Sequence, residues 1–400
     1  MKKSLLMLLL TIAFAFTACQ SNELYIISDD TDPDNIGMNE LSDISIPDYK
    51  YENYEVMSAV KPSEYIWYNR TSRGIMFMPN DGIIRVYNPE AGSLNPLCPD
   101  PLCTHLPYSG CPYGNCIFTG SIPTEYNGRL YYFVKDEYIK NEQQYNEYII
   151  YSTDLTGQNI NKLYQNSGDY MYGLTISDDR AFFLEFIDAD NVQLKSISLN
   201  NGIISLLNTE KEAVVESFVI MNDIIYYILN TGELFSCTHD FENVSFEYNI
   251  KSVIKLFGFA DTGKLYWILD NTIYEYDPSE KECKELISAG EGLHFANSFI
   301  EDDGIYYQMV PNEISYNMLY DDYLTGIRNY NTLYCLDPRT MQSKSYDLPE
   351  KVLLVPNTTI ICNGLLISQT FIKNENTKKP GGRTYIAYDL KNQTEYTIIE

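Results

Sequence analysis

The residues best suited to chemistry lie together in the first third of the chain. Cys98, Cys103, His105 and Cys111 follow a C-x4-C-x-H-x5-C pattern, and Cys116 comes five residues later. Thiolates and an imidazole are ligands that zinc prefers, and four protein ligands leave no open position for a substrate. The pattern therefore predicts one structural zinc, or another soft metal, at Cys98, Cys103, His105 and Cys111.

Two other interpretations fit the same residues. In an exported protein, Cys98, Cys103, Cys111 and Cys116 would form two disulfides, and a sequence does not choose among the three pairings that four cysteines allow. Unpaired thiols in an anaerobic setting are the third interpretation. Prolines restrict the backbone and would reduce the cost of ordering the segment around a metal; they are Pro96, Pro99, Pro101, Pro107 and Pro112.

The sequence contains no common catalytic signature. It has no G-x-S-x-G elbow, no H-E-x-x-H and no phosphate-binding glycine loop. Three histidines disfavour a histidine-dependent active site, whereas 55 acidic residues leave carboxylate chemistry open. A glycan hydrolase or lyase, which needs two carboxyl groups about 5–10 Å apart, is the alternative to a non-catalytic function. The formal net charge of −27 repels nucleic acid and excludes it as a partner.

A two-part strand pattern recurs along the chain and must position these residues. The first part is a turn followed by an aliphatic-aromatic run, as in Asn127-Gly128-Arg129-Leu130-Tyr131-Tyr132. The second is a strand that runs into an Asp or Asn turn, as in Ile273-Tyr274-Glu275-Tyr276-Asp277. Seven copies can be aligned at positions 76, 131, 183, 226, 266, 306 and 366. Repeats of about 40 residues with several strands each are typical of β-propeller blades. We expect an all-β propeller of seven four-stranded blades, with six or eight as alternatives.

The N-terminus has the features of a lipoprotein leader. Lys2 and Lys3 precede an apolar stretch, Leu5 to Phe16, that is too short for a membrane span. Phe16-Thr17-Ala18-Cys19 resembles a bacterial lipobox, in which the cysteine receives the lipid. We therefore predict a signal peptide over residues 1–18, a lipid on Cys19, an acidic flexible tether over 19–49 and the propeller over 50–400. The expected location is the extracytoplasmic face of the cell membrane.

Three connections are longer than the others. If the turn-then-aromatic run is the second strand of each blade, residues 134–148, 308–332 and 371–383 all join second to third strands on one face. Aromatic and acidic side chains in these connections suit a protein, peptide or glycan ligand. The candidate ligand-binding residues are Tyr138, Tyr145, Tyr148, Tyr316, Tyr320, Asp321, Asp322, Tyr323 and Tyr330. The cysteine segment follows the last strand of the first blade, and we expect it on the same face.

The chain resembles surface lipoproteins of Firmicutes that are built as TolB-like or YWTD-like propellers of uncharacterised function. The resemblance rests on the lipobox, the blade repeats and the segment Leu97-Cys98-Pro99-Asp100-Pro101-Leu102-Cys103-Thr104-His105 with Cys111-Pro112. It implies a propeller at the cell surface and supplies no activity. A non-catalytic binding protein is therefore the first functional expectation, with a scaffold for a membrane complex as a related one.

Overall fold

The computed structural model divides the chain into two units, Met1–Asp48 and Tyr49–Glu400. The residues that the structure describes all belong to the second unit; they are 59–60, 68–78, 83–105, 110–118, 122–140, 143–167, 170–188, 191–207, 214–250, 256–269, 271–301, 304–314, 326–350, 352, 354, 359–362, 364–373 and 380–397. No helix in these ranges is long and apolar enough to cross a membrane.

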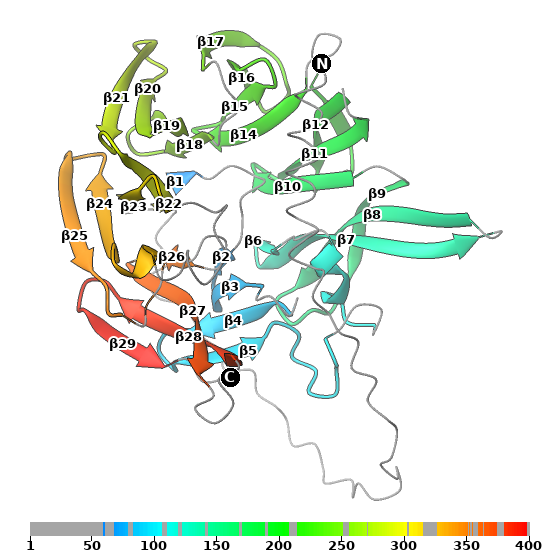
Figure 1. The fold of residues 1–400 in the computed structure, drawn as a ribbon. Helices are drawn as coiled ribbons and strands as arrows, with labels where there is room; N and C mark the ends of the chain where they lie inside the picture. Colours follow the sequence, from blue (N-terminus) through cyan, green and yellow to red (C-terminus); the bar gives the residue numbers. More distant parts are fainter. Residues whose placement is uncertain are drawn as a thin grey trace, which may run out of the picture. The chain divides into compact units, whose positions relative to one another are not determined.

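The described residues form seven antiparallel sheets, each with four consecutive strands in chain order, and one of them has a fifth short strand at its edge. This confirms the propeller of seven four-stranded blades. Figure 1 shows the sheets following one another around a ring. Their strands are β2 (Tyr68–Thr71), β3 (Gly74–Phe77), β4 (Arg85–Asn88) and β5 (Ser93–Pro96) in blade 1; β6 (Thr124–Tyr126), β7 (Arg129–Lys140), β8 (Gln143–Asp154) and β9 (Asn161–Ser167) in blade 2; β10 (Tyr170–Ser177), β11 (Arg180–Asp188), β12 (Asn191–Ser198) and β13 (Ile204–Leu206) in blade 3; β14 (Val215–Met221), β15 (Ile224–Leu229), β16 (Glu233–Thr238) and β17 (Ser245–Asn249) in blade 4; β18 (Leu256–Phe259), β19 (Lys264–Leu269), β20 (Thr272–Asp277) and β21 (Glu282–Ser288) in blade 5; β22 (Leu293–Glu301), β23 (Gly304–Pro311), β24 (Thr332–Asp337) and β25 (Gln342–Asp347) in blade 6; and β26 (Ile360–Cys362), β27 (Leu365–Lys373), β28 (Pro380–Asp389) and β29 (Thr394–Thr397) in blade 7.

Apolar side chains between neighbouring sheets hold the ring together. Each pair of consecutive blades shares one buried cluster, from blades 1 and 2 through to blades 6 and 7. A seventh cluster joins blade 7 back to blade 1, where Phe77 and Tyr385 pack edge to face with ring centroids 5.6 Å apart. Both faces of the central strands are therefore buried, which explains why their sequences are continuous apolar and aromatic runs.

Turn chemistry fixes the strand register. Asn127 and Gly128 between β6 and β7 both have positive φ, as do Asn222 and Asp223 between β14 and β15. Two such residues make the turn that suits the twist of a tight hairpin. Between third and fourth strands in six blades, a side-chain oxygen of Asp or Asn accepts from the amide two residues on; Asp277, for example, accepts from Ser279 at 2.9 Å. In blade 4 the hydroxyl of Thr238 accepts from the amide of Glu242 instead. The recurring sequence pattern thus consists of these two kinds of turn and the strands beside them.

The strand order gives the ring two different faces. Turns between second and third strands and the connections between blades lie on one face, which we call the hairpin face. The paired ends of β7 and β8 and of β27 and β28 lie on it, as do the end of β23 and the start of β24. Two of the three expected loops, 134–148 and 371–383, are for the most part strand. β7 and β8 stay paired from Arg129↔Asp154 to Lys140↔Gln143. β27 and β28 stay paired as far as Lys373↔Pro380. In Figure 1 the β7–β8 hairpin projects beyond the rest of blade 2.

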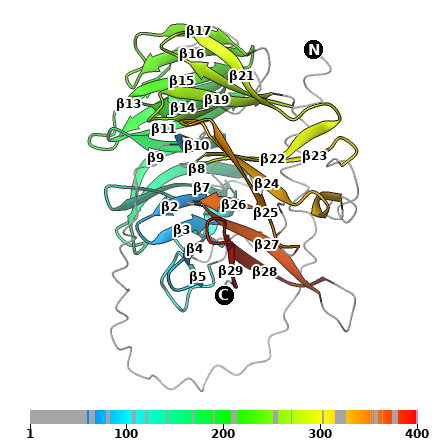
Figure 2. The same cartoon turned by 90° about the vertical axis from the view of Figure 1, so that its left-hand side faces the viewer.

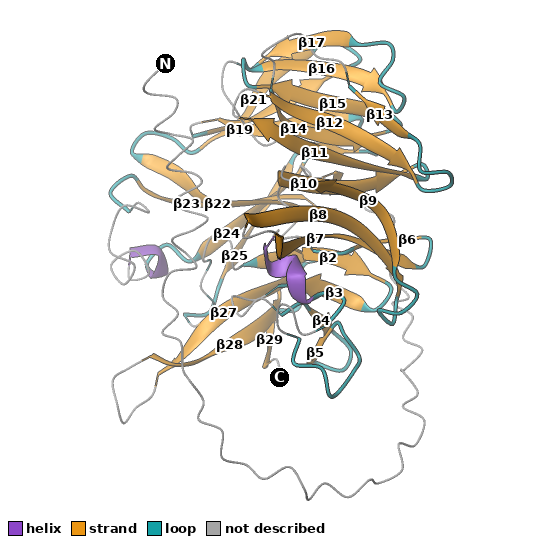
Figure 3. Ribbon diagram, turned by 90° about the vertical axis from the view of Figure 1, so that its right-hand side faces the viewer, coloured by secondary structure: helices purple, strands orange, loops and turns teal. Residues whose placement is uncertain are grey.

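Outside the blades, regular structure is scarce in the described residues. Figures 2 and 3 show strands throughout, apart from short helical stretches at 326–328 and at η2 (Gly114–Phe118) beside β7. One further strand, β1 (Ala59–Val60), pairs antiparallel with the inner edge of β18 in blade 5.

Candidate metal centre

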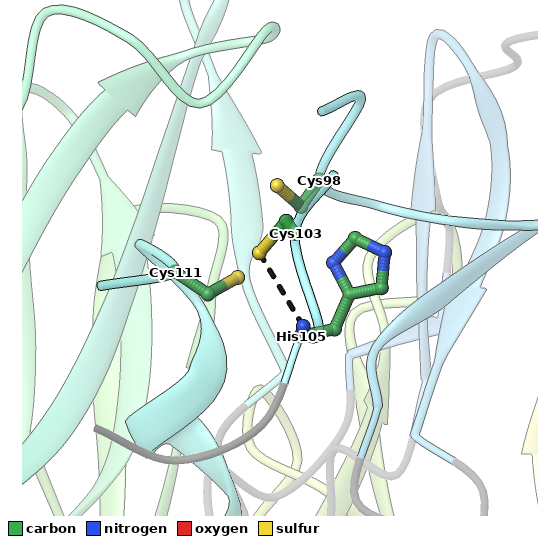
Figure 4. A group of neighbouring side chains, drawn as sticks. All are labelled: Cys98, Cys103, His105 and Cys111. Carbon is green, nitrogen blue, oxygen red and sulfur yellow. Dashed lines mark hydrogen bonds between the residues drawn. The ribbon is translucent and has the colours of Figure 1, made fainter. Parts of the chain in front are cut away.

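The structure brings the four expected ligands together. One ligand atom from each of Cys98, Cys103, His105 and Cys111 lies within 4.8 Å of the other three. Around a tetrahedral zinc with bonds of about 2.3 Å to sulfur and about 2.0 Å to nitrogen, neighbouring ligand atoms are about 3.5–3.8 Å apart. A contraction of about 1 Å would therefore complete the coordination shell. In Figure 4 the sulfur atoms of Cys103 and Cys111 point toward each other, with Cys98 and the His105 ring beside them.

Backbone amides support each of the three sulfur atoms. The amide of His105 donates to Sγ of Cys103 at 3.3 Å. The amides of Asp100 and Tyr113 donate in the same way to Cys98 and Cys111. Each donor lies two residues after its cysteine. Since N–H donors favour the charged form of an acceptor, this arrangement stabilises thiolates, the form that binds a metal.

His105 supplies a second indication of a ligand site. Its Nδ1 atom is buried and has no hydrogen-bond partner in the described structure. An unsatisfied buried nitrogen costs about 1–3 kcal/mol, and a metal ion would satisfy it. The residue has a positive φ of 59°, an uncommon conformation that costs about 1–3 kcal/mol outside glycine. The backbone is thus held in an unfavourable conformation that places the imidazole beside the thiols.

The electrostatics of the cluster favour a cation. Burial raises the pKa of the Cys98 thiol, and burial together with the neighbouring thiols raises the pKa of Cys111 to about 12. Three clustered thiolates repel one another in a half-buried place, and a divalent cation removes that penalty. The donor set, three sulfurs and one imidazole nitrogen, is the chemistry of a structural zinc site. The cluster can therefore hold a soft metal.

No disulfide joins the cysteines of the described residues. All eight cysteines of the described residues are free, and Cys116 is fully buried and does not belong to the four-residue cluster. It packs with Leu130 and Tyr132 of blade 2. Cys116 therefore has the surroundings of a small apolar core residue.

The cysteine segment lies between blades 1 and 2, and not simply on the hairpin face as the sequence suggested. Tyr113 reaches across blade 2, where its hydroxyl lies 3.1 Å from Oγ1 of Thr153 and its ring covers Gly157 in the turn between β8 and β9. Asn115 donates to Asp136 of β7 at 2.6 Å. The reason is apolar burial: Tyr113 is only 3% exposed and packs against Tyr132 with ring centroids 5.1 Å apart.

The expected ligand-binding residues are only partly located by the structure. Tyr148 is 7% exposed and packs edge to face on Tyr170, so it belongs to the core between blades 2 and 3 and not to an exposed surface. Tyr330 is 42% exposed, after the helical stretch at 326–328. Tyr138 and Tyr145 face each other across the β7–β8 ladder, and their side chains are outside the described part. Tyr316, Tyr320, Asp321, Asp322 and Tyr323 lie outside the described residues, as do residues 1–18, Cys19 and the 19–49 tether.

Sequence reasoning missed the groups that position the cluster. Tyr113 and Asn115 carry the segment onto blade 2, and nothing in their spacing distinguishes them. It also missed Glu275, a buried carboxylate that pairs with Lys264 and Lys284 at 2.8 Å each. The available signal for that network was one lysine at the start of β19 and charged residues at alternate positions of β20 and β21.

The comparisons with known proteins add no function. No family model and no curated protein matches the sequence. Solved structures with a similar arrangement include an oligogalacturonate lyase in complex with manganese, at 12% identity and a TM-score of 0.43 over 66% of this chain and 84% of that one. TolB from Acinetobacter baumannii has 12% identity and a TM-score of 0.37 over 82% of this chain and 77% of that one. The class that the fold and the site define is a seven-bladed β-propeller with a Cys3His cluster between its first two blades.

Proposed function

We propose that the protein is a lipid-anchored, extracytoplasmic propeller that acts as a non-catalytic binding or scaffold protein and holds one structural zinc. The zinc proposal is based on four protein ligand atoms that lie within 4.8 Å of one another. Because protein supplies all four ligands, a zinc ion there has no free position for water or substrate. The metal thus serves the fold, and ligands would bind elsewhere.

The hairpin face is the proposed binding surface. The two long hairpins extend on this face, and the ends of β23 and β24 open on it, as the strand order requires. Connections that project from a rigid scaffold are the usual place for recognition. Tyr330 supports a contact role because the residue is 42% exposed. The ligand class is a protein, a peptide or a glycan.

The lipid anchor rests on the lipobox alone. Export followed by acylation of Cys19 would place the propeller outside the cytoplasmic membrane, on an acidic tether. An oxidising location does not conflict with the zinc, since a bound metal protects thiolates that would otherwise pair.

Metal analysis of the purified mature chain tests the zinc. We expect one equivalent of zinc per chain, released when a thiol reagent modifies three cysteines. A chain without metal whose clustered thiols resist modification would instead support disulfides.

Incubation with cell-envelope glycan fragments separates binding from catalysis. A binding protein retains fragments without changing them. New reducing ends or unsaturated products would establish the glycan hydrolase or lyase instead. A Tyr330→Ala variant, matched with Tyr396→Ala on the outer strand of blade 7, tests whether retention depends on the hairpin face. The two residues are similarly exposed, at 42% and 43%.

A further inference from the structure

The ring has one interface that the chain does not cross. Blade 1 contains only strands from the N-terminal part of the described chain, and blade 7 only strands from the C-terminal part. Among the described residues, no N-terminal strand joins the sheet of blade 7, and no C-terminal strand joins the sheet of blade 1. We call the interface between blades 1 and 7 the seam. The other six interfaces gain from covalent connection between their blades, which makes the seam the easiest place for the ring to open.

Side chains of blade 1 make the contacts across the seam that the described residues show. Phe77 of β3 packs on Tyr385 of β28, and Nε of Arg70 donates to Sγ of Cys362 at 2.8 Å. The hydroxyl of Tyr68 donates to the carbonyl of Ile361. These contacts require that blade 1 keeps its position relative to the rest of the ring.

Blade 1 is poorly able to hold that position by itself. Its four strands have four residues each, whereas β7 and β8 of blade 2 have twelve. Few ladder hydrogen bonds and little buried area make such a sheet marginal in isolation. Its stability must therefore come largely from its neighbours.

The metal cluster joins blade 1 to blade 2. Cys98 comes two residues after the end of β5, and Leu97 still pairs with Ile84 of blade 1 at 2.8 Å. At the other end, Cys111 leads into Tyr113 and Asn115, which are fixed on β8 and β7. A metal bound by Cys98 and Cys111 therefore ties the last strand of blade 1 to the body of blade 2.

We propose that metal binding at Cys98, Cys103, His105 and Cys111 is a latch that holds blade 1 in place and thereby keeps the seam closed. The proposal rests on the metal site of the proposed function. Loss of the metal frees blade 1 from blade 2 along its outer edge. The seam contacts then open more often, although blades 3 to 6 keep their packing.

Hydrogen exchange followed by mass spectrometry tests the latch on the full mature chain. We compare the zinc-loaded, metal-stripped and reloaded protein. Removal of zinc should speed exchange about tenfold or more in β3, β4 and β27, on both sides of the seam, and leave β15 and β16 of blade 4 unchanged. Reloading should restore protection. If the chain binds zinc but exchange changes only within 97–118, the latch is wrong and the metal site stands. A chain that binds no zinc would overturn the proposed site as well.

Linkage supplies a second test that does not touch the cluster. If zinc favours the closed seam, weakening the seam must weaken zinc binding by the same coupling. Tyr385→Ala removes a seam ring on blade 7, and we expect zinc affinity to fall about threefold or more. Tyr227→Ala is the matched control, because Tyr227 is similarly buried in blade 4. Equal zinc affinities in the two variants would contradict the latch.

Discussion

Replacement of one cluster thiol gives the sharpest prediction for stability. Cys111→Ser removes the ligand that belongs to the blade 2 side of the site. Serine is a poor ligand for a soft metal, so the variant should bind zinc weakly or not at all. The matched control is Cys283→Ser, which removes a half-buried thiol from blade 5, outside the cluster.

The size of the effect follows from the loop that the metal closes. Ligation from Cys98 to Cys111 constrains a loop of about 15 residues, for which a cross-link contributes roughly 3 kcal/mol to the free energy of unfolding. A domain of this size loses about 2 °C of melting temperature per kcal/mol. We therefore expect Cys111→Ser to melt about 6 °C below the wild type. Cys283→Ser should lose less than about 1 kcal/mol.

Thermal unfolding with and without a chelator is the assay. The chelator should lower the melting temperature of the wild type and of Cys283→Ser by about 6 °C, and it should leave Cys111→Ser unchanged. The reasoning would be refuted if the wild type were insensitive to the chelator, or if the chelator still lowered the melting temperature of Cys111→Ser.

Other predictions concern the anchor, the blades and acid stability. Cys19→Ala should be released to the medium or keep its uncut leader, with the propeller intact; membrane fractionation checks this, and a processed, membrane-bound variant would contradict the lipobox. Gly74→Ala should lower the free energy of unfolding by more than about 2 kcal/mol, because the new Cβ would lie 2.3 Å from the carbonyl oxygen of Tyr87. Gly92→Ala, whose Cβ would have nothing within 4 Å, should lower it by about 1 kcal/mol. Equal urea midpoints for the two variants would refute the clash. Burial opposes ionisation of Glu275, but hydrogen bonds from Lys264 and Lys284 outweigh it and lower its pKa. The stability that Glu275 contributes is therefore complete above its pKa in the unfolded chain, about 4.3, and is lost as the pH falls through its pKa in the folded protein. Urea unfolding of Glu275→Gln should show lower stability at pH 7 and a weaker pH dependence below about pH 5; parallel curves for the two proteins would be the contrary result.

The repeating strands were predictable because the propeller repeats its local chemistry. The aligned positions 76 and 266 both fall in second strands, β3 and β19, and the Asp turns fall between third and fourth strands. The length of the β7–β8 hairpin was not predictable. Beyond Val134 its sequence becomes polar, so it lacks the apolar pattern that marks a buried strand, although the ladder continues to Lys140.

The ligand set was predictable from residue type and spacing, but its surroundings were not. Four possible metal ligands in one short proline-rich segment must lie close together in space. The place of that segment depends on Tyr113, whose burial against Tyr132 is a tertiary contact between residues of different elements. Tyr148, which the sequence placed in a loop, is buried in a strand. Its apolar neighbours Ile149 and Ile150 lie on opposite faces of β8 in different blade interfaces, so a strand buried on both faces left no exposed position there.

X-ray absorption at the zinc edge of the purified mature protein is the most direct measurement of the central claim. The account predicts three sulfur ligands at about 2.3 Å and one nitrogen ligand at about 2.0 Å, with no oxygen ligand, and the loss of one sulfur in Cys111→Ser. A site with a water or carboxylate oxygen in the zinc shell would contradict a closed structural centre. A protein that contains no metal would contradict the centre altogether.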